Sequence, residues 1–182
     1  MKKEKEQYKK LIRSIIVILL VACETIIFMH YWINIYNKYT VFPFFQKGHW
    51  MMAAMYIIYQ IIFLYIFGGL KVGYLKKANI IFSQVLAMLG SNVIIYLQIV
   101  LLSVRFVNIV PMMKATLVDI CVVVIVAIIS ESIFRKLFPP RELIVLYEDY
   151  DPDEFIKKMN SRKDKYIIKQ KLNVSDGLDK IK

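Results

Sequence analysis

Four long apolar runs constrain this chain more than any other feature of its sequence. They cover residues 11–36, 49–70, 78–102 and 109–138. A bilayer core about 30 Å thick needs roughly 20 apolar residues for one helical crossing, so each run is long enough to span a membrane. The runs use most of the chain, of which 58% is hydrophobic. We therefore predict an all-α membrane domain of four transmembrane helices over residues 1–138.

The distribution of Lys and Arg predicts the orientation of this domain, because short cytoplasmic loops keep positive charge and exported loops are depleted of it. Positive residues are frequent before the first run, between the second and third, and after the fourth, and scarce in the other two loops. We therefore expect both termini in the cytoplasm. The frequent group is Lys2, Lys3, Lys5, Lys9, Lys10, Arg13, Lys71, Lys76, Lys77, Arg135, Lys136 and Arg141, and the scarce group is Lys38, Lys47, Arg105 and Lys114.

The formal net charge of +11 does not indicate a nucleic-acid partner. Nucleic-acid binders gather Lys and Arg on one exposed face with aromatic side chains for stacking, whereas the charges here flank apolar runs. Cys23 and Cys121 both fall inside predicted spans. We interpret them as small packing residues, not as a disulfide or a metal pair.

Residues 139–182 change abruptly to a soluble composition after a double proline. The run LIVLY at 143–147 predicts a strand, the sequence DPDE from Asp151 predicts a helix start, and residues 165–171 predict a second strand. Residues 176–181 are expected to begin another helix. About forty residues cannot close an α/β layer, so we expect an incomplete cytoplasmic α/β module that is truncated or depends on a partner.

Three carboxylates lie inside the predicted spans. An ionisable group near a bilayer centre costs roughly 2.5–3.5 kcal/mol on insertion scales, so it faces protein or water. The three carboxylates are Glu24, Asp119 and Glu131. We interpret Glu24 and Asp119 as buried, hydrogen-bonded or neutral groups and place Glu131 near the inner interface beside Arg135. A proton or substrate path is the alternative.

Gln84, Ser91 and Gln98 are spaced by seven, which places them on one helix face, with Asn92 adjacent. Such a stripe could line a cavity. Amides and hydroxyls in bilayer helices more often join neighbouring helices, at about 0.6 kcal/mol each, and we adopt this interpretation.

No motif in the sequence predicts a catalytic or metal site. His30 and His49 lack Cys, Asp or Glu partners at ligand spacing, so we assign them interfacial roles. Glu148 and Asp149 form an adjacent carboxylate pair after the first predicted strand, where acidic residues are ordinary loop and cap chemistry. They would also repel phosphate at a site where a nucleotide-binding turn needs glycines.

Two segments carry a resemblance to a known family. They are FGGLKVGYLKK from Phe67 followed by IIFSQVLAMLGSNVIIYLQIVLL from Ile80, and the tail PPRELIVLYEDYDPDEFIKKMNSRKDKYII from Pro139. They resemble the N-terminal membrane region, and the start of the Rossmann-like module that follows it, in bacterial polyprenyl-phosphate sugar-1-phosphate transferases. These polyprenyl glycosylphosphotransferases initiate exopolysaccharide or capsule repeat units.

The resemblance implies a bacterial cell membrane and a reaction that moves a sugar phosphate from a nucleotide sugar to polyprenyl phosphate, usually with Mg²⁺. In that family an Asp-Glu pair in a C-terminal domain does the chemistry, and no residue of this chain matches it. We therefore expect no cofactor bound by this chain and leave open whether the chain belongs to an enzyme. Its expected partners are the lipid bilayer and a catalytic domain or partner protein, and a homo-oligomer stays open.

The predicted function is thus the membrane-anchoring or regulatory N-terminal part of a sugar transferase, without the catalytic domain. The alternative is a four-helix membrane sensor or accessory protein that docks a cytoplasmic partner, with Glu24 and Asp119 responding to a ligand or to protons. The candidate polar positions within the membrane are Glu24, Gln84, Ser91, Gln98 and Asp119.

Overall fold

The computed structural model describes residues 2–147, 152–160 and 166–173. Most of them are helical. In chain order the elements are α1 (Lys2–Asn34), the 3-10 helix η1 (Tyr36–Tyr39), α2 (Gln46–Ile66), α3 (Lys77–Ser103), α4 (Val110–Leu137), β1 (Arg141–Tyr147), α5 (Asp153–Asn160) and β2 (Tyr166–Asn173).

Helices α1 to α4 are each long and apolar enough to cross a membrane. This agrees with the four predicted spans, and the bounds differ most at the start of α1 and the end of α2. Helix α1 begins about nine residues before the apolar run, because the Lys- and Glu-rich start has good helix formers. Helix α2 ends at Ile66, and Gly68 then adopts a positive φ of 75° in the turn that follows.

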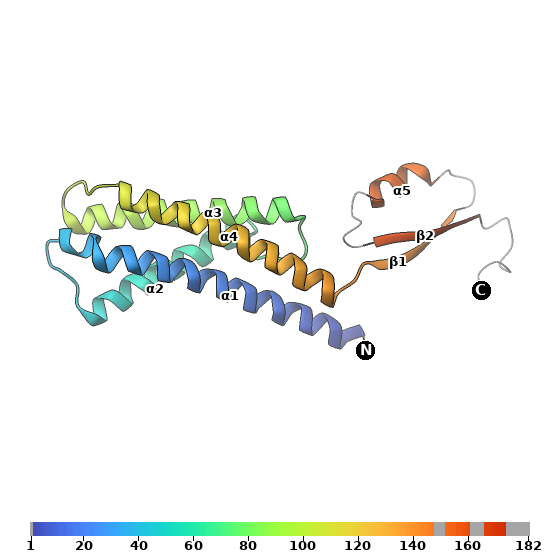
Figure 1. The fold of residues 1–182 in the computed structure, drawn as a ribbon, viewed down its shortest axis with the longest axis horizontal. Coiled ribbons are helices and arrows are strands. Elements are labelled where there is room, and N and C mark those ends of the chain that lie inside the picture. Colours follow the sequence, from blue (N-terminus) through green and yellow to red (C-terminus); the bar gives the residue numbers. More distant parts are fainter. Residues whose placement is uncertain (1, 148–151, 161–165, 174–182) are drawn as a thin grey trace. The chain divides into compact units, whose positions relative to one another are not determined.

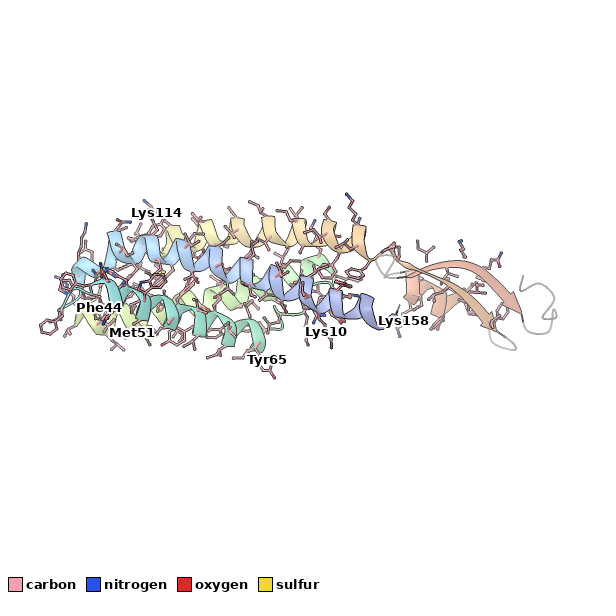
Figure 2. The ribbon with its side chains drawn as sticks, turned by 90° about the horizontal axis from the view of Figure 1, so that it is seen from below. Lys10, Phe44, Met51, Tyr65, Lys114 and Lys158 are labelled. Atoms are coloured by element: carbon pink, nitrogen blue, oxygen red, sulfur yellow. The ribbon has the colours of Figure 1, made fainter. Side chains whose placement is uncertain are left out.

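The chain divides into two compact units, Met1–Glu131 and Ser132–Lys182. In the first, α1 to α4 run alongside one another (Figure 1). Most of the large apolar side chains on their outer surfaces are exposed in the protein alone, as expected for lipid-facing helices. Figure 2 shows Phe44 and Met51 near one end of this unit, with Lys10 and Tyr65 toward the other.

Helices α2 and α3 form a closely packed pair. At Gly90 of α3, an added Cβ would lie 2.9 Å from ring atoms of Phe63 on α2, so only glycine leaves room for this ring. Small residues allow helix backbones to approach in the same way in other membrane bundles. The Phe63 ring also stacks on Phe67, with centroids 6.1 Å apart.

In the second unit, β1 and β2 form a two-stranded parallel sheet joined by α5. Parallel pairing needs a crossover connection, and α5 supplies it. The register runs from Arg141 opposite Tyr166 to Tyr147 opposite Asn173, with an irregularity between Leu143 and Ile144. Both predicted strands and a helix between them are present in the structure, with bounds that differ by up to two residues from those predicted for the strands.

Helix α5 is fixed to the sheet at its first residue, where Asp153 accepts a hydrogen bond from Lys171 of β2. Asp153 and Glu154 occupy the first turn and Lys157 and Lys158 the last, an arrangement that complements the helix dipole. The predicted cap at Asp151, the pair Glu148 and Asp149, and the helix predicted at 176–181 lie outside the described residues.

Candidate functional site

The four long helices each contribute polar side chains to a buried cluster that we call the acidic core. Its members are Glu24 of α1, Tyr56 and Gln60 of α2, Asn92 of α3, and Thr116 and Asp119 of α4. Glu24, Tyr56 and Gln60 have no exposed surface, and Asn92 and Asp119 are almost fully buried. Polar groups at this depth need protein partners.

Glu24 and Gln60 are joined directly. The Gln60 amide Nε2 donates a hydrogen bond to the Glu24 carboxyl Oε2. Tyr56 lies one helical turn before Gln60 on the same face of α2, and its ring stacks on Phe28 of α1 at 4.6 Å between centroids. This contact holds α1 and α2 together beside the carboxyl group.

Asn92 links α2 and α4 through α3. Its Oδ1 accepts a hydrogen bond from the Tyr56 hydroxyl at 3.1 Å. Its Nδ2 donates to Asp119 Oδ2 at 3.2 Å and to Thr116 Oγ1 at 3.0 Å. The side-chain amide therefore bridges both neighbouring helices, and the Asp119 carboxyl is close enough to Glu24 for the two groups to interact electrostatically.

The acidic core has more acceptors than donors. Among the described residues, Glu24 Oε1, Gln60 Oε1 and Asp119 Oδ1 are buried without a hydrogen-bond partner. The donors of Tyr56 and Asn92 are already directed at other atoms. Three unmatched oxygen atoms, two of them on carboxyl groups, make this cluster suited to accept positive charge.

The two predicted carboxylates are thus brought together, but the predicted stripe on α3 is not one site. Gln84 donates to the backbone oxygen of Gly69 at 3.3 Å, and Ser91 donates to Ala87 of its own helix at 2.9 Å. Gln98 accepts from Tyr59 at 3.1 Å and donates to the Met55 sulfur at 3.0 Å. Gln98 thus joins α3 to α2, whereas the Ser91 hydrogen bond stays within α3.

Sequence reasoning missed Tyr56, Gln60 and Thr116 as members of the acidic core, and named Asn92 only as a neighbour of the stripe. Gln60 did give a signal, since it is an isolated amide in the apolar run of α2. A tyrosine or threonine in such a run gives none, because both are common near membrane surfaces and in helix packing.

A second polar arrangement, the aromatic end, joins the turns at the α1–α2 and α3–α4 connections. Trp32 Nε1 donates to His49 Nδ1 at 3.1 Å, and the Tyr96 hydroxyl donates to the Val107 oxygen at 2.7 Å. The Tyr36 hydroxyl donates to the Asn108 oxygen at 3.1 Å and accepts from the Met112 amide at 2.9 Å. Tyr36 thereby supplies an acceptor to the first turn of α4, whose amides have no partner within the helix.

Tyr36 lies outside the candidate spans and is fully buried. Burial raises the pKa of its hydroxyl to about 12, because the charged phenolate would lose its hydration, while the hydrogen bond from Met112 acts in the opposite direction. The group is therefore neutral at ordinary pH and able to donate and accept at once.

At the opposite end of the helical unit, which we call the basic end, two cationic side chains lie over the ring of Tyr74. The Arg13 guanidinium lies 4.2 Å from the Tyr74 ring centroid, and Lys9 lies 5.2 Å from the same ring. Lys77 of α3 pairs with Glu131 of α4 at 3.2 Å. Glu131, the third carboxylate in the predicted spans, therefore forms a partly exposed ion pair with the first residue of α3 and lies apart from the acidic core.

Comparison with family models, with curated proteins and with solved structures found no match. Within residues 2–147, 152–160 and 166–173, no group of three or more His, Cys, Asp or Glu side chains is arranged to hold a metal ion. Cys23 and Cys121 are free thiols. The acidic core, with two carboxyl groups and neutral amides, is the candidate site that the geometry supports.

Proposed function

We propose that this chain is the membrane-anchoring and regulatory N-terminal part of a bacterial sugar transferase system that initiates exopolysaccharide or capsule synthesis. In that system a sugar phosphate moves from a nucleotide sugar to polyprenyl phosphate. The chemistry belongs to a separate catalytic domain or protein, with Mg²⁺, and this chain holds that part at the membrane.

The observation that carries the proposal is the parallel β1–α5–β2 unit that follows α4. Ile144 and Leu146 of β1 and Ile167 of β2 are exposed, whereas Leu143 and Val145 are half-buried on the alternate positions of β1. Parallel sheets are almost always covered on both faces and continued at their edges. A further layer of protein therefore fits this unit, and the resemblance of the tail to a Rossmann-like module makes the catalytic part of the transferase our choice of occupant.

The orientation is part of the proposal. The loops rich in Lys and Arg, including the α2–α3 connection with Lys71, Lys76 and Lys77, are placed on the cytoplasmic side of a bacterial cell membrane. Both termini then lie in the cytoplasm, where nucleotide sugars are found. The β1–α5–β2 unit would face the same compartment as the proposed partner.

Activity that copurifies with the chain tests this function. The chain is purified in mild detergent from membranes of its own host and, separately, from an unrelated host, and each sample is given UDP-sugars, polyprenyl phosphate and Mg²⁺. We expect UMP release from the first sample and none from the second. Deleting the gene should also lower surface polysaccharide, and complementation should restore it.

Two variants with the same charge change make the test specific. Ile144→Asp places a carboxylate on the exposed sheet face and should abolish the copurifying UMP release. Lys157→Gln on exposed α5 also lowers the charge by one but leaves the sheet face intact, so it should retain the activity. The proposal fails if the host-purified chain releases no UMP and the deletion leaves polysaccharide unchanged.

A further inference from the structure

The acidic core is buried inside the helical unit. Glu24 is about two-thirds of the way along α1, and Asp119 is about one-third of the way along α4, both inside candidate spans. Both carboxyl groups are buried against protein, with Tyr56 the only other titratable side chain of the cluster that faces them. Helix α3 contributes a neutral amide, Asn92, and no charged side chain to this cluster.

Charge balance restricts which combinations of bound protons and cations this cluster can hold. Two ionised carboxylates would place two negative charges together in a medium of low dielectric constant, which is strongly unfavourable. Two protons give a neutral cluster. One proton with one monovalent cation gives a neutral cluster as well, and a divalent cation would require both carboxylates and a fuller oxygen shell.

The unmatched oxygen atoms favour a metal cation as one of these states. Glu24 Oε1, Gln60 Oε1 and Asp119 Oδ1 come from α1, α2 and α4 and belong to side chains that are nearly or fully buried. Protonation of both carboxyl groups would turn Glu24 Oε1 and Asp119 Oδ1 from acceptors into donors, whereas a cation would take all three oxygens as ligands. Carboxylate and amide oxygens are hard ligands, which suit small hard cations and not soft metals.

We propose that the acidic core binds one Na⁺ ion in exchange for one proton, with Glu24 Oε1, Gln60 Oε1 and Asp119 Oδ1 as ligands. Before uptake, both carboxyl groups are protonated. Binding one Na⁺ ionises one carboxyl group and releases one H⁺ to the aqueous phase, so the net charge of the core stays at zero. The three helices that supply the ligands, α1, α2 and α4, are then held together by the ion, and Na⁺ acts as a stabilising ligand of the bundle.

Proton release tests the exchange without any substitution. The purified full chain, in detergent and weak buffer with a pH-sensitive dye, is titrated with NaCl at constant ionic strength maintained with choline chloride. We expect saturable release of about one H⁺ per chain, and an apparent Na⁺ dissociation constant that rises about tenfold for each unit of lower pH. Release that does not saturate, or that choline chloride reproduces, overturns the proposal.

Thermal unfolding of variants locates the site. Na⁺ should raise the Tm of the unaltered chain relative to choline, because a ligand that binds only the folded state stabilises it. Asp119→Asn and Glu24→Gln should each lose this shift. Glu131→Gln, the same carboxylate-to-amide change at a different position of α4, should keep it. A Tm that depends on pH but is equal in Na⁺ and choline means a proton-only core and overturns the proposal, as does a Na⁺ shift retained in both core variants.

Discussion

The aromatic end and the acidic core of the helical unit both bury polar side chains, but they satisfy them to different degrees. At the aromatic end, the Tyr36 hydroxyl both donates and accepts, and the Trp32 indole has His49 as its acceptor. In the acidic core, three buried oxygens of Glu24, Gln60 and Asp119 have no partner among the described residues. Satisfied groups fix a structure, whereas unmatched acceptors are suited to a ligand.

The largest loss of stability should come from removing the buried Trp32 ring at the aromatic end. Trp32 is fully buried, so Trp32→Ala leaves a cavity and should lower the free energy of unfolding by about 3–5 kcal/mol. Trp50→Ala is the matched control, because 77% of that side chain is exposed, and it should cost about 0.5 kcal/mol. Unfolding in mixed micelles measures both. Equal costs would show that the aromatic end is not a packed core.

The Tyr36 hydroxyl should contribute the next largest amount. Tyr36→Phe leaves the Met112 amide and the Asn108 oxygen without their partner and should cost about 1–3 kcal/mol. Tyr65→Phe removes a hydroxyl from an exposed side chain and serves as the control. A Tyr36 variant as stable as the control would contradict the capping of α4.

The pKa of Tyr36 gives this contribution a pH dependence. Its folded pKa of about 12 lies above the ordinary tyrosine value of 10.0, so the folded state holds the proton more tightly than the unfolded state. The stabilisation is fully present below pH 10.0 and is lost as the pH rises toward about 12. Denaturation midpoints measured across this window should fall more steeply in the unaltered chain than in Tyr36→Phe.

Tyr56→Phe makes the same chemical change in the acidic core and should have a smaller effect. The hydroxyl makes one hydrogen bond, to Asn92, and the ring keeps its stacking on Phe28. Such bonds in membrane bundles contribute about 0.6–1.7 kcal/mol. Unfolding under the conditions used for Tyr36→Phe gives a direct comparison. A larger loss of stability from Tyr56→Phe would contradict our view that the aromatic end is the better satisfied of the two regions.

The smallest expected effect is a gain in stability from a substitution at Val104, where α3 ends. Val104 ends α3 with φ 50° and ψ 23°, a left-handed conformation that is strained for a β-branched residue. Because 79% of its side chain is exposed, Val104→Gly loses little packing and should add about 0.5–1 kcal/mol of stability. Val110→Gly, at a half-exposed helical position, should destabilise instead.

The sequence predicted the helices well because membrane spanning is a local property. Each apolar run is long enough by itself, and Gly68 and Pro139 mark turns without help from distant residues. The strand, helix and strand of the tail follow from local patterns too. The parallel pairing of β1 with β2 then follows from the intervening helix.

The acidic core could be predicted only in part. Glu24 and Asp119 are conspicuous in apolar runs, but their proximity depends on which helix faces which, and no local pattern encodes this. Asn92 bridges α2 and α4 only because α3 packs between them. The seven-residue spacing on α3 gave greater prominence to Ser91, whose hydroxyl bonds its own helix.

The contact of Gly90 with the Phe63 ring bears on how the bundle can move. The Phe63 ring of α2 sits directly against the backbone of α3 at Gly90, and a rigid ring packed this closely opposes sliding of one helix along the other. The carboxyl groups are carried by α1 and α4, outside this pair. A rearrangement of the bundle would therefore move the carboxyl-bearing helices α1 and α4 relative to the α2–α3 pair.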